Sequence, residues 1–502
     1  MKLQIVRIAI AFLLFTSACT NTSDNPVSSD APLEEKVSYR VENTPLPPGL
    51  YAETGALAFL PDGRLVACFL RGEVMLYNPA TKEWSLFAEG LHEPLGILVI
   101  SNSEFLVMQR PELTRIKDTD GDGHADLYEK VTNDFGMSGN YHEWNYGPVK
   151  DEEGNLFIAL STASNAGTIM KEVRGKLDTS TLVDKQEKYS AVPYRGWILK
   201  LTPGGILEPY ASGFRSPNGL GFDLERNLFC IDNQGGWVGT NGIYHVEKGK
   251  FYGHPSSLPW TKNWSGGDPF KIPVDELNKM RTKASVLFPY EIIGNSLTQP
   301  LCDNTDGKFG PFSGQMLLGE MEKGRIVRVM MENVGGALQG ACIPLFDSKD
   351  LRQGNNRLAF APDGSLWVGH VQYGFPGDLG IQRIVYTGKT PMDIYSMNLT
   401  PTGFDLTFTK PVDKTSAMQI DNYNFRSYYY EYHWQYGSDL FDVQPIPVTN
   451  VQVSPDRKKV SLTLAALKSD RIYELNLGEI KSVSGDSLAN KIICYTINKL
   501  KK

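Results

Sequence analysis

A degenerate repeat is the feature that most limits how this chain can fold. Residues 55–65 and 357–366 share one order: an apolar stretch, a Pro-Asp-Gly turn and a second apolar stretch. Residues 147–156 and 219–228 carry weaker copies of this pattern, and 315–318 supply a copy without its turn. A further match lies just upstream of these turns, where residues 90–97 parallel 213–220. Proline, aspartate and glycine favour tight turns, so each copy predicts two antiparallel strands joined by a turn.

The spacing of the copies predicts how these strands are organised. Counting the strand after each turn gives six units, and a unit of roughly 40 to 90 residues is typical of propeller blades, each a four-stranded antiparallel sheet. The sequence therefore predicts an all-β protein with a six-bladed β-propeller over residues 47–388. Seven blades are compatible with the long insertions between 171 and 281. The alternative fold is one irregular β-sandwich. It is disfavoured because the copies match on both sides of the turn.

The pattern changes after residue 390. Polar and apolar residues alternate strictly over 404–409, 459–464 and 472–477. A period of two with polar outer faces indicates antiparallel strands with one buried face. We therefore predict a small antiparallel β-sandwich (Ig-like) domain over residues 391–502.

The N-terminus has the features of an export signal. Lys2 and Arg7 precede an apolar run over 8–15, and small residues lead to Cys19. This pattern predicts a lipoprotein signal peptide over residues 1–19, ending at a lipidated Cys19, and a flexible tether over 20–46. The expected location is the bacterial cell envelope, as a periplasmic or outer-membrane lipoprotein held to the membrane by its lipid. Plain secretion is the alternative.

Composition excludes several classes of function. Fifty Lys and Arg against 57 Asp and Glu give a formal net charge of -7, which argues against a nucleic-acid partner. The other five cysteines form no CxxC or paired Cys/His pattern, which disfavours structural zinc and covalent haem; Cys68 and Cys230 are expected to be buried. The sequence also lacks a phosphate-binding glycine loop, a G-x-S-x-G elbow and an HExxH motif.

Residues 118–129 match the twelve-residue calcium-loop pattern. Carboxylates at alternate positions can converge on one hard cation, and Gly123 permits the sharp turn that this requires. The flanking residues resemble blade strands and not helices, so Glu129 is the ligand that could point away from the ion. The predicted role is a structural clip, with a catalytic metal as the alternative. The predicted metal ligands are Asp118, Asp120, Asp122, His124, Asp126 and Glu129.

The repeat also predicts a second cluster of functional residues. Equivalent positions of different blades lie at the same end of the propeller channel, where ligands usually bind. Aligning the copies places four basic residues, His92, His142, Arg215 and Arg352, around one channel mouth. Such a ring suits an anionic ligand or an oxyanion, and His142 could act as a general base. The expected polar neighbours are Asn218, Asn355, Asn356 and Asp232.

Several segments resemble the glucose/sorbosone dehydrogenase-like propellers, some of which use pyrroloquinoline quinone (PQQ). The resemblance spans about 47–388 and rests on residues 213–219, 229–233, 251–255 and 358–366, although Ser216 stands where the family has Asn. It implies that His142 takes a proton from a sugar hydroxyl while hydride passes to the quinone, and that Arg215 stabilises the reduced cofactor. The basic ring suits the three carboxylates of PQQ. The expected cofactor-binding residues are His92, Arg352, Asn218, Asn355 and Asp232.

Three hypotheses about function follow. The first is a lipid-anchored, PQQ-dependent oxidoreductase acting on a small-molecule carbohydrate or polyol, with an electron acceptor that the sequence leaves open. The second is a propeller lyase or hydrolase for uronic-acid-containing oligosaccharides, in which the Arg/His ring neutralises the substrate carboxylate and His142 or Tyr141 abstracts the adjacent proton. The third is a non-catalytic glycan-binding surface protein that uses the tyrosines of the sandwich.

Overall fold

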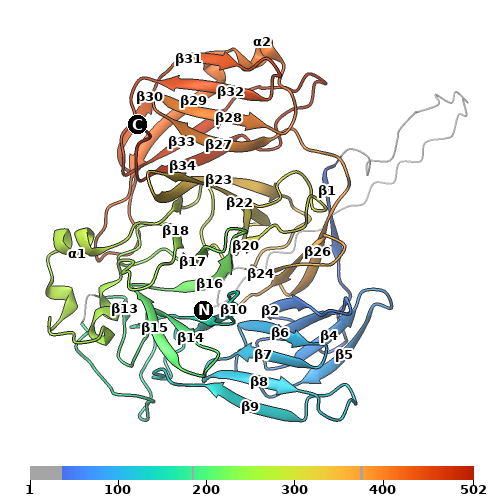
Figure 1. Ribbon diagram of the computed structural model, residues 1–502, viewed down its shortest axis with the longest axis vertical. Helices are drawn as coiled ribbons and strands as arrows, with labels where there is room; N and C mark the ends of the chain where they lie inside the picture. The colour runs from blue at the N-terminus through green and yellow to red at the C-terminus, as the bar shows by residue number, and fades with distance from the viewer. Residues whose placement is uncertain (1–36, 184–185, 374–376) are drawn as a thin grey trace, which may run out of the picture. The chain divides into compact units, whose positions relative to one another are not determined.

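The computed structural model describes residues 37–183, 186–373 and 377–502. The predicted signal peptide, Cys19 and most of the predicted tether lie outside these residues. Within the described part, strands account for most of the regular structure and helices are few and short (Figure 1). None of the helices in these ranges is long and apolar enough to cross a membrane.

Six four-stranded antiparallel units succeed one another along the described residues. The first two units contain β2 (Thr54–Phe59), β3 (Leu65–Phe69), β4 (Val74–Asn78) and β5 (Glu83–Ala88), then β6 (Gly96–Ser101), β7 (Glu104–Met108), β8 (Leu113–Lys117) and β9 (Leu127–Thr132). The third contains β10 (Asn145–Lys150), β11 (Leu156–Leu160), β14 (Trp197–Leu201) and β15 (Leu207–Ser212). A short hairpin inserted between β11 and β14 is formed by β12 (Ala163–Ser164) and β13 (Lys188–Tyr189).

The remaining three units complete the set. The fourth contains β16 (Pro217–Phe222), β17 (Leu228–Asp232), β18 (Asn241–His245) and β19 (Val286–Phe288), with η2 (Pro255–Trp260), η3 (Pro269–Lys271) and α1 (Val274–Met280) inserted before β19. The fifth contains β20 (Leu301–Cys302), β21 (Met316–Glu320), β22 (Arg325–Val334) and β23 (Ala337–Asp347). The sixth contains β24 (Asn355–Phe360), β25 (Leu366–His370), β26 (Gly380–Tyr386) and β1 (Tyr39–Asn43).

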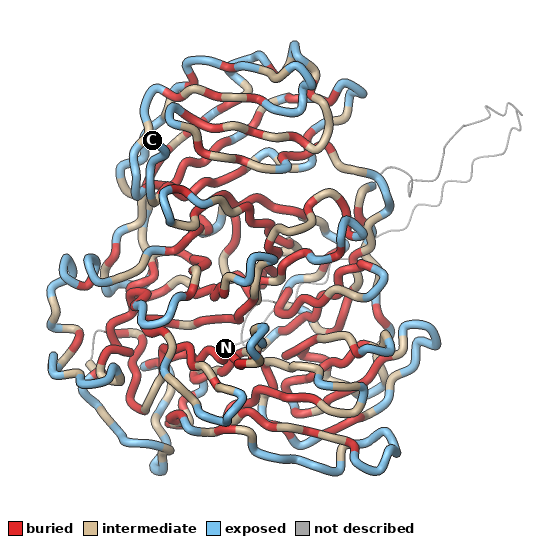
Figure 2. The backbone as a smooth tube through the Cα atoms, in the orientation of Figure 1, coloured by how far each residue is buried: buried red, intermediate tan, exposed pale blue. Residues whose placement is uncertain are grey.

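The first strands of these units close into a ring. β2 contacts β6, β6 contacts β10, β10 contacts β16 and β16 contacts β20, while β24 contacts both β21 and β2. A ring of four-stranded sheets whose inner strands touch in cyclic order is a β-propeller, so the predicted fold class is confirmed. The strands nearest the interior are largely buried, as the red segments of Figure 2 show.

The repeated turns have the predicted chemistry. Gly63 and Gly364 both have a positive φ, 90° and 87°, which a side chain would disfavour. The preceding aspartate accepts a hydrogen bond from the backbone N–H two residues on: Asp62 from Arg64 at 3.0 Å and Asp363 from Ser365 at 2.9 Å. These Asx turns fix the register of the strands on either side.

The sixth sheet differs from the prediction at its outer edge. Residues 39–43 fall within the segment predicted as a flexible tether, yet they form β1, which pairs antiparallel with β26 from Tyr39↔Tyr386 to Asn43↔Gln382. This pairing joins the start of the described chain to its last propeller sheet. An N-terminal strand that supplies the outer edge of the last sheet closes the ring. The sequence did not predict this strand because a short polar strand has no local pattern that identifies its distant partner.

The C-terminal residues form two facing antiparallel sheets. One contains β27 (Ile394–Thr400), β28 (Gly403–Phe408), β32 (Lys459–Leu464) and β31 (Val448–Val453), and the other contains β34 (Ile492–Ile497), β33 (Arg471–Leu477), β29 (Tyr423–Tyr429) and β30 (Phe441–Ile446). Two short helical segments, α2 (Lys414–Ala417) and η4 (Ile420–Asn422), connect β28 to β29. Phe404, Phe425 and Tyr495 lie in the core between the sheets. The predicted sandwich is present, and its Ig-like character stays a prediction.

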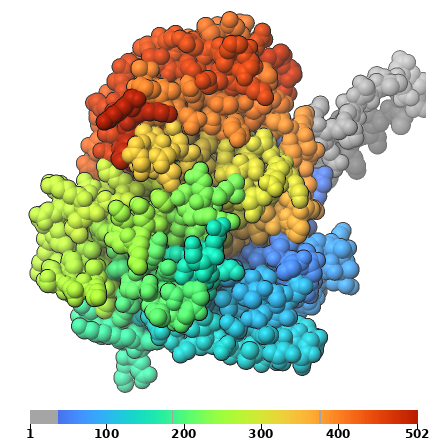
Figure 3. All heavy atoms as spheres, in the orientation of Figure 1, coloured from blue at the N-terminus to red at the C-terminus, as the bar shows by residue number. Residues whose placement is uncertain are grey.

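The sandwich and the propeller share one sheet. β23 pairs with β34, which makes the fifth propeller unit and the second sandwich sheet a single eight-stranded sheet. In the space-filling view, the orange and red residues of the sandwich adjoin the yellow residues of this unit (Figure 3). Buried and exposed residues were expected to alternate along β33. Instead, both faces of the strand are buried except at Asn476, because its second face packs against the propeller. Glu474 is consequently buried and bonded to Arg426 and Tyr428.

Cysteines at the described positions are free and buried, which confirms the prediction for Cys68 and Cys230. Burial raises the pKa of both thiols well above its usual value, so they remain protonated and unreactive.

Candidate functional site

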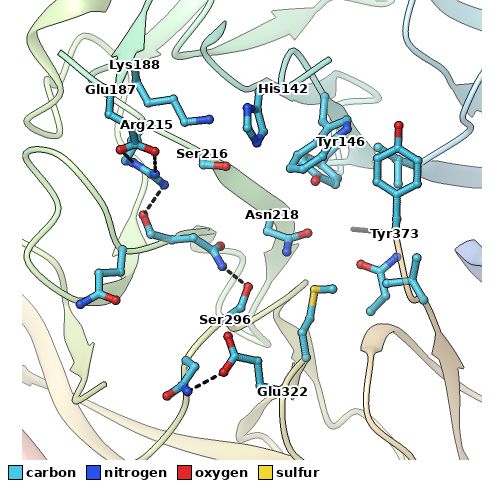
Figure 4. A pocket seen from close by; sticks show the side chains of 18 of the residues that line it. His142, Tyr146, Glu187, Lys188, Arg215, Ser216, Asn218, Ser296, Glu322 and Tyr373 are labelled. Carbon is cyan, nitrogen blue, oxygen red and sulfur yellow. Dashed lines mark hydrogen bonds and ion pairs between the residues drawn. The ribbon is translucent and has the colours of Figure 1, made fainter. Parts of the chain in front are cut away.

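A pocket lies at one end of the ring of inner strands. The empty space within it, including the open solvent at its mouth, is about 1070 Å³. Some of the residues that line it sit at or just before the start of β6, β10, β16 and β24, among them Leu95, Tyr146, Asn218 and Asn356. Figure 4 labels Tyr146 and Asn218. Several sheets therefore contribute to one site, as expected for a propeller.

His142 lies on the wall of this pocket, in the loop before β10. Its Nδ1 atom is in contact with the hydroxyl of Ser164, a buried residue of β12. Because Nδ1 is engaged with the protein, Nε2 is the ring nitrogen left for a ligand. The ring also packs edge-on against Trp144, with the ring centroids 5.2 Å apart.

Asn140 fixes the position of His142. Its side-chain oxygen accepts hydrogen bonds from the backbone N–H of His142 at 3.0 Å and from that of Ser164 at 3.2 Å. Its amide nitrogen donates to the Ser164 carbonyl at 2.8 Å and to the Tyr189 hydroxyl at 3.1 Å. One fully buried amide thus ties the His142 loop to the β12–β13 hairpin.

The surroundings of His142 keep its imidazole uncharged. Burial, together with the positive charges of Lys188, Arg215 and Arg110, lowers the pKa of His142 to about 3. At neutral pH the ring is therefore neutral and carries a free lone pair, which is the form that a general base needs.

Arg215 lies on the adjacent wall and is itself nearly buried. Its guanidinium forms a two-point ion pair with Glu187, with Nε 3.2 Å from one carboxylate oxygen and Nη2 in contact with the other. A Cβ atom at position 235 would come within 1.9 Å of Nε, so only glycine leaves room for this side chain. Asp232 accepts the backbone N–H groups of Arg215 and Ser216 at 2.8 and 2.6 Å and holds the loop in place.

Lys188 is a third basic group in the pocket that the sequence did not reveal. It belongs to β13, where it is the cross-strand partner of Ser164, and its side chain extends between Arg215 and His142 (Figure 4). It is 3% exposed, and burial and the charge of Arg215 lower its pKa to about 7. One of the three positive charges near His142 thus comes from a hairpin inserted within one blade, whereas Arg110 and Arg215 come from loops outside it.

The predicted ring of four basic residues does not form. His142 and Arg215 line the pocket, whereas His92 and Arg352 line separate hollows. The pocket also contains carboxylates, so its charge is mixed and not basic. Those lining it are Glu93, Glu187 and Glu322.

Local backbone geometry explains why His92 is displaced. Glu93 has a positive φ of 46°, and this turn directs Glu93 to the pocket and leaves His92 exposed in a neighbouring hollow that Glu93 and Tyr373 also line. Arg352 is instead committed to the chain around β1: it donates to the Asn43 side chain at 2.8 Å and lies 3.8 Å from Asp378. Aligning the repeats predicted the positions of these loops correctly, but it did not predict which way each side chain points.

The predicted polar neighbours divide in the same way. Asn218 and Asn356 line the pocket, and their side-chain oxygens accept hydrogen bonds from Arg357 at 3.2 and 2.9 Å. Asn355 faces away and donates to the carbonyls of Glu320 and Lys323 at 2.9 and 3.0 Å. Asp232 lies beneath the Arg215 loop, where burial raises its pKa to about 6.

The C-terminal sandwich also reaches the pocket. Most aromatic residues of 423–436 pack internally, and Tyr432 packs against Trp237 with ring centroids 5.1 Å apart. Tyr436 instead lines the pocket: it is 67% exposed, and its ring centroid lies 5.3 Å from the Arg215 guanidinium carbon. Tyr290, also partly exposed, lines the same mouth.

The acidic loop connects β8 and β9, two strands of one sheet, as predicted. Carboxylate oxygens of Asp118, Asp120 and Asp122 lie within 4.8 Å of one another. Desolvation opposes ionisation of Asp118, but hydrogen bonds from the Gly121 and Gly123 N–H groups hold its pKa below the usual value.

The later positions of the acidic loop have other partners. The Asp126 carboxylate accepts hydrogen bonds from the N–H and hydroxyl of Thr119, and Glu129 lies 3.6 Å from Arg115. The backbone N–H of His124 donates to Asp122 at 2.8 Å. Calcium binding at this loop stays a prediction.

Most of the pocket residues that the sequence did not predict were missed for one reason. Glu93 lies in the aligned segment next to His92, whereas the other such residues line the pocket from loops and insertions outside the repeat: Glu187, Lys188, Glu322, Tyr290, Tyr373 and Tyr436. No motif or spacing marks them, since their common feature is position in space. The only available signal was the high tyrosine content of the C-terminal segment.

Comparisons with known proteins do not assign an activity to this chain. A family model described as "Domain of unknown function (DUF7133)" matches residues 80–280. No curated protein matches the chain.

Solved structures give similarities at low identity. The PQQ-bound aldose sugar dehydrogenase of Streptomyces coelicolor is 15% identical, with a TM-score of 0.47 over 69% of this chain and 98% of that protein. The soluble aldose sugar dehydrogenase of Escherichia coli is 15% identical, with a TM-score of 0.44 over 69% and 99%. A carbohydrate-active enzyme of family AA12 from Trichoderma reesei is 11% identical, with a TM-score of 0.48 over 70% and 96%. The function is therefore argued from the pocket itself.

Proposed function

We propose that this protein is an oxidoreductase that oxidises a hydroxyl group of a sugar or polyol in the propeller pocket. The observation that carries the proposal is a neutral His142, anchored through Nδ1 and flanked by Arg215 and Lys188. Nε2 of His142 would accept the hydroxyl proton, and the neighbouring cations would stabilise the negative charge that develops on the oxygen.

The lining suits a polyhydroxylated substrate. Amide groups of Asn218, Asn233 and Asn356 and the carboxylates of Glu93 and Glu322 can bond to sugar hydroxyls from several directions. The exposed rings of Tyr290 and Tyr436 at the mouth are suited to pack against the apolar face of a sugar. Specificity would come from these groups, while the chemistry depends on the wall that holds His142.

PQQ is the cofactor that we propose for this site. Arg215 would supply positive charge to its carboxylates, and the amides of Asn218 and Asn356 would supply neutral donors. Of the four basic residues expected, only Arg215 brings a positive charge to the pocket, and Lys188 is a further basic group there. When bound, the quinone supplies the acceptor for the hydride. Asp232 and Glu187 would act indirectly, by holding the Arg215 backbone and guanidinium.

We also propose two features outside the pocket. The loop from Asp118 to Asp126 would bind calcium and brace the β8–β9 edge, because three clustered carboxylates repel one another without a cation. Export and lipid attachment at Cys19, in the bacterial cell envelope, are proposed from the sequence pattern alone.

A titration with PQQ in the presence of calcium tests the cofactor. Trp144 lies in the pocket, so binding should quench tryptophan fluorescence in a saturable way. Arg215→Met should abolish the quenching, whereas Arg226→Met, which alters an exposed arginine paired with Glu152, should not. Equal quenching in both variants would show that the quinone binds elsewhere.

Activity with an artificial electron acceptor tests the reaction. His142→Ala should lower kcat by about 10²- to 10⁴-fold while PQQ still binds, because only the proton acceptor is lost. If the protein neither binds PQQ nor reduces the acceptor with any aldose or polyol, the dehydrogenase proposal is wrong. Cofactor-free cleavage of uronic-acid oligosaccharides would then support the lyase or hydrolase alternative.

A further inference from the structure

Lys188 has an environment that is unusual for a lysine. Its side chain is 3% exposed, yet it lines the pocket, and its amine points into the space between Arg215 and His142 (Figure 4). Among the described residues, none forms a hydrogen bond or an ion pair with its Nζ atom. The nearest carboxylate along the chain, Glu187, is engaged with Arg215. A buried amine that has no partner and faces a cavity is available to a ligand.

The surrounding charges favour the free amine. Burial and the positive charge of Arg215 lower the pKa of Lys188, and Glu187 and Asp232 only partly offset this. His142 and His254 are both held neutral by their surroundings and therefore add no charge near the amine. A desolvated lysine beside another cation is a recognised way to obtain a nucleophilic amine near neutral pH. The resulting pKa of about 7 leaves a large fraction of Lys188 uncharged at pH 7.

We propose that Lys188 is a covalent binding site for small hydroxy-aldehydes and hydroxy-ketones, which it captures as an imine. The Nζ lone pair attacks the carbonyl carbon, and the C–N bond forms as the carbonyl π electrons move to oxygen. A proton passes from nitrogen to that oxygen to give a carbinolamine. Loss of water then forms the C=N bond. No oxidant or reductant is consumed, and hydrolysis reverses each step.

The neighbours of Lys188 suit this chemistry. Ser164 is its cross-strand partner and also the residue that contacts Nδ1 of His142, so the hairpin places the amine and the imidazole on the same wall. Nε2 of the neutral imidazole can move the proton between nitrogen and oxygen. The hydroxyl groups of the captured compound would meet the same amides and carboxylates that suit a sugar. This activity is separate from the proposed oxidation and requires no quinone.

Reductive trapping tests the proposal on the intact protein without PQQ. Glycolaldehyde is the probe, sodium cyanoborohydride reduces any imine to a stable secondary amine, and peptide mass spectrometry measures the modified fraction of each lysine at pH 7. Lys188 should be modified about 100-fold faster than an exposed lysine such as Lys459, because exposed lysines are almost fully protonated at pH 7. The rate at Lys188 should rise with pH around a midpoint near its pKa of about 7.

Two variants separate the site from general reactivity. Lys188→Arg keeps the positive charge but cannot form an imine, so the rapid modification should vanish, while Lys459→Arg should leave it unchanged. Modification of Lys188 at the rate of exposed lysines, or rapid modification that survives in Lys188→Arg, would overturn the proposal. Because trapping needs neither PQQ nor turnover, failure of the dehydrogenase assay would not affect this result.

Discussion

The hydroxyl of Ser164 contacts Nδ1 of His142, and this contact decides which nitrogen of the ring is left for chemistry. We expect Ser164→Ala to lower kcat about 10-fold with little change in KM, since one orienting hydrogen bond is lost without loss of the base. Steady-state kinetics with the best sugar or polyol measures the effect. Ser161→Ala is the matched control, because this buried serine bonds to the Pro217 carbonyl and not to His142. An equal loss of activity in both variants would indicate general damage to the blade.

The pKa of His142 gives a prediction for pH dependence. A folded-state value of about 3 means that the imidazole stays neutral above about pH 4, so activity should show no acid limb near pH 6.5 that belongs to this residue. The substitution Lys188→Met removes a positively charged group beside His142. It should therefore raise the pKa of His142 towards neutral pH. NMR titration of labelled histidine follows the change, with Lys200→Met on β14 as the control. An unaltered His142 titration in Lys188→Met would contradict the proposed electrostatic cause.

Tyr436 tests whether the sandwich contributes to substrate binding. Tyr436→Ala should raise KM for an oligosaccharide about 3- to 10-fold and leave kcat nearly unchanged, because the ring is at the mouth and not beside His142. Tyr395→Ala removes another exposed tyrosine, on β27 and outside the pocket lining, and should have no effect. A fall in kcat alone would show that Tyr436 acts on the chemical step and not on binding.

Calcium should stabilise the protein through the β8–β9 loop. Calcium at 100 times its Kd should raise the free energy of unfolding by about 2.7 kcal/mol and therefore raise the Tm, and a chelator should reverse this. Asp118→Asn should abolish the calcium-dependent shift, because Asp118 is the least exposed of the three clustered carboxylates. Asp306→Asn, in a turn outside this loop, should retain it. A calcium shift that persists in Asp118→Asn would place the ion elsewhere.

The sequence predicted the elements that local chemistry controls. The Pro-Asp-Gly turns required glycine at a positive φ, as at Gly63 and Gly364, and their recurrence predicted the sheets and the propeller. Strict alternation in β28 and β32 predicted buried Phe404 and Leu462 and a two-sheet C-terminal region. These inferences succeeded because turn formation and strand amphipathicity depend on neighbours within a few residues.

The candidate site followed the repeat only in part. His142, Arg215 and Asn218 were found because they lie at equivalent ends of inner strands, which the repeat aligns. His92 was misplaced because a single left-handed residue, Glu93, reverses which side chain faces the channel. The repeat specifies where a loop lies, but the direction of a side chain depends on backbone dihedrals that spacing does not encode.

The sequence alone determined the turns, the strand pattern and the propeller class, because each depends on short-range backbone preferences and the period of apolar residues. Only the tertiary structure decided the chemistry of the pocket. Lys188 comes from an inserted hairpin, Glu187 neutralises part of Arg215, and Tyr436 arrives from the C-terminal sheets. β1 likewise pairs with β26 across more than 300 residues. The low pKa of His142 results from burial together with positive charges that come from distant segments of the chain. These segments surround His142 only once the chain has folded.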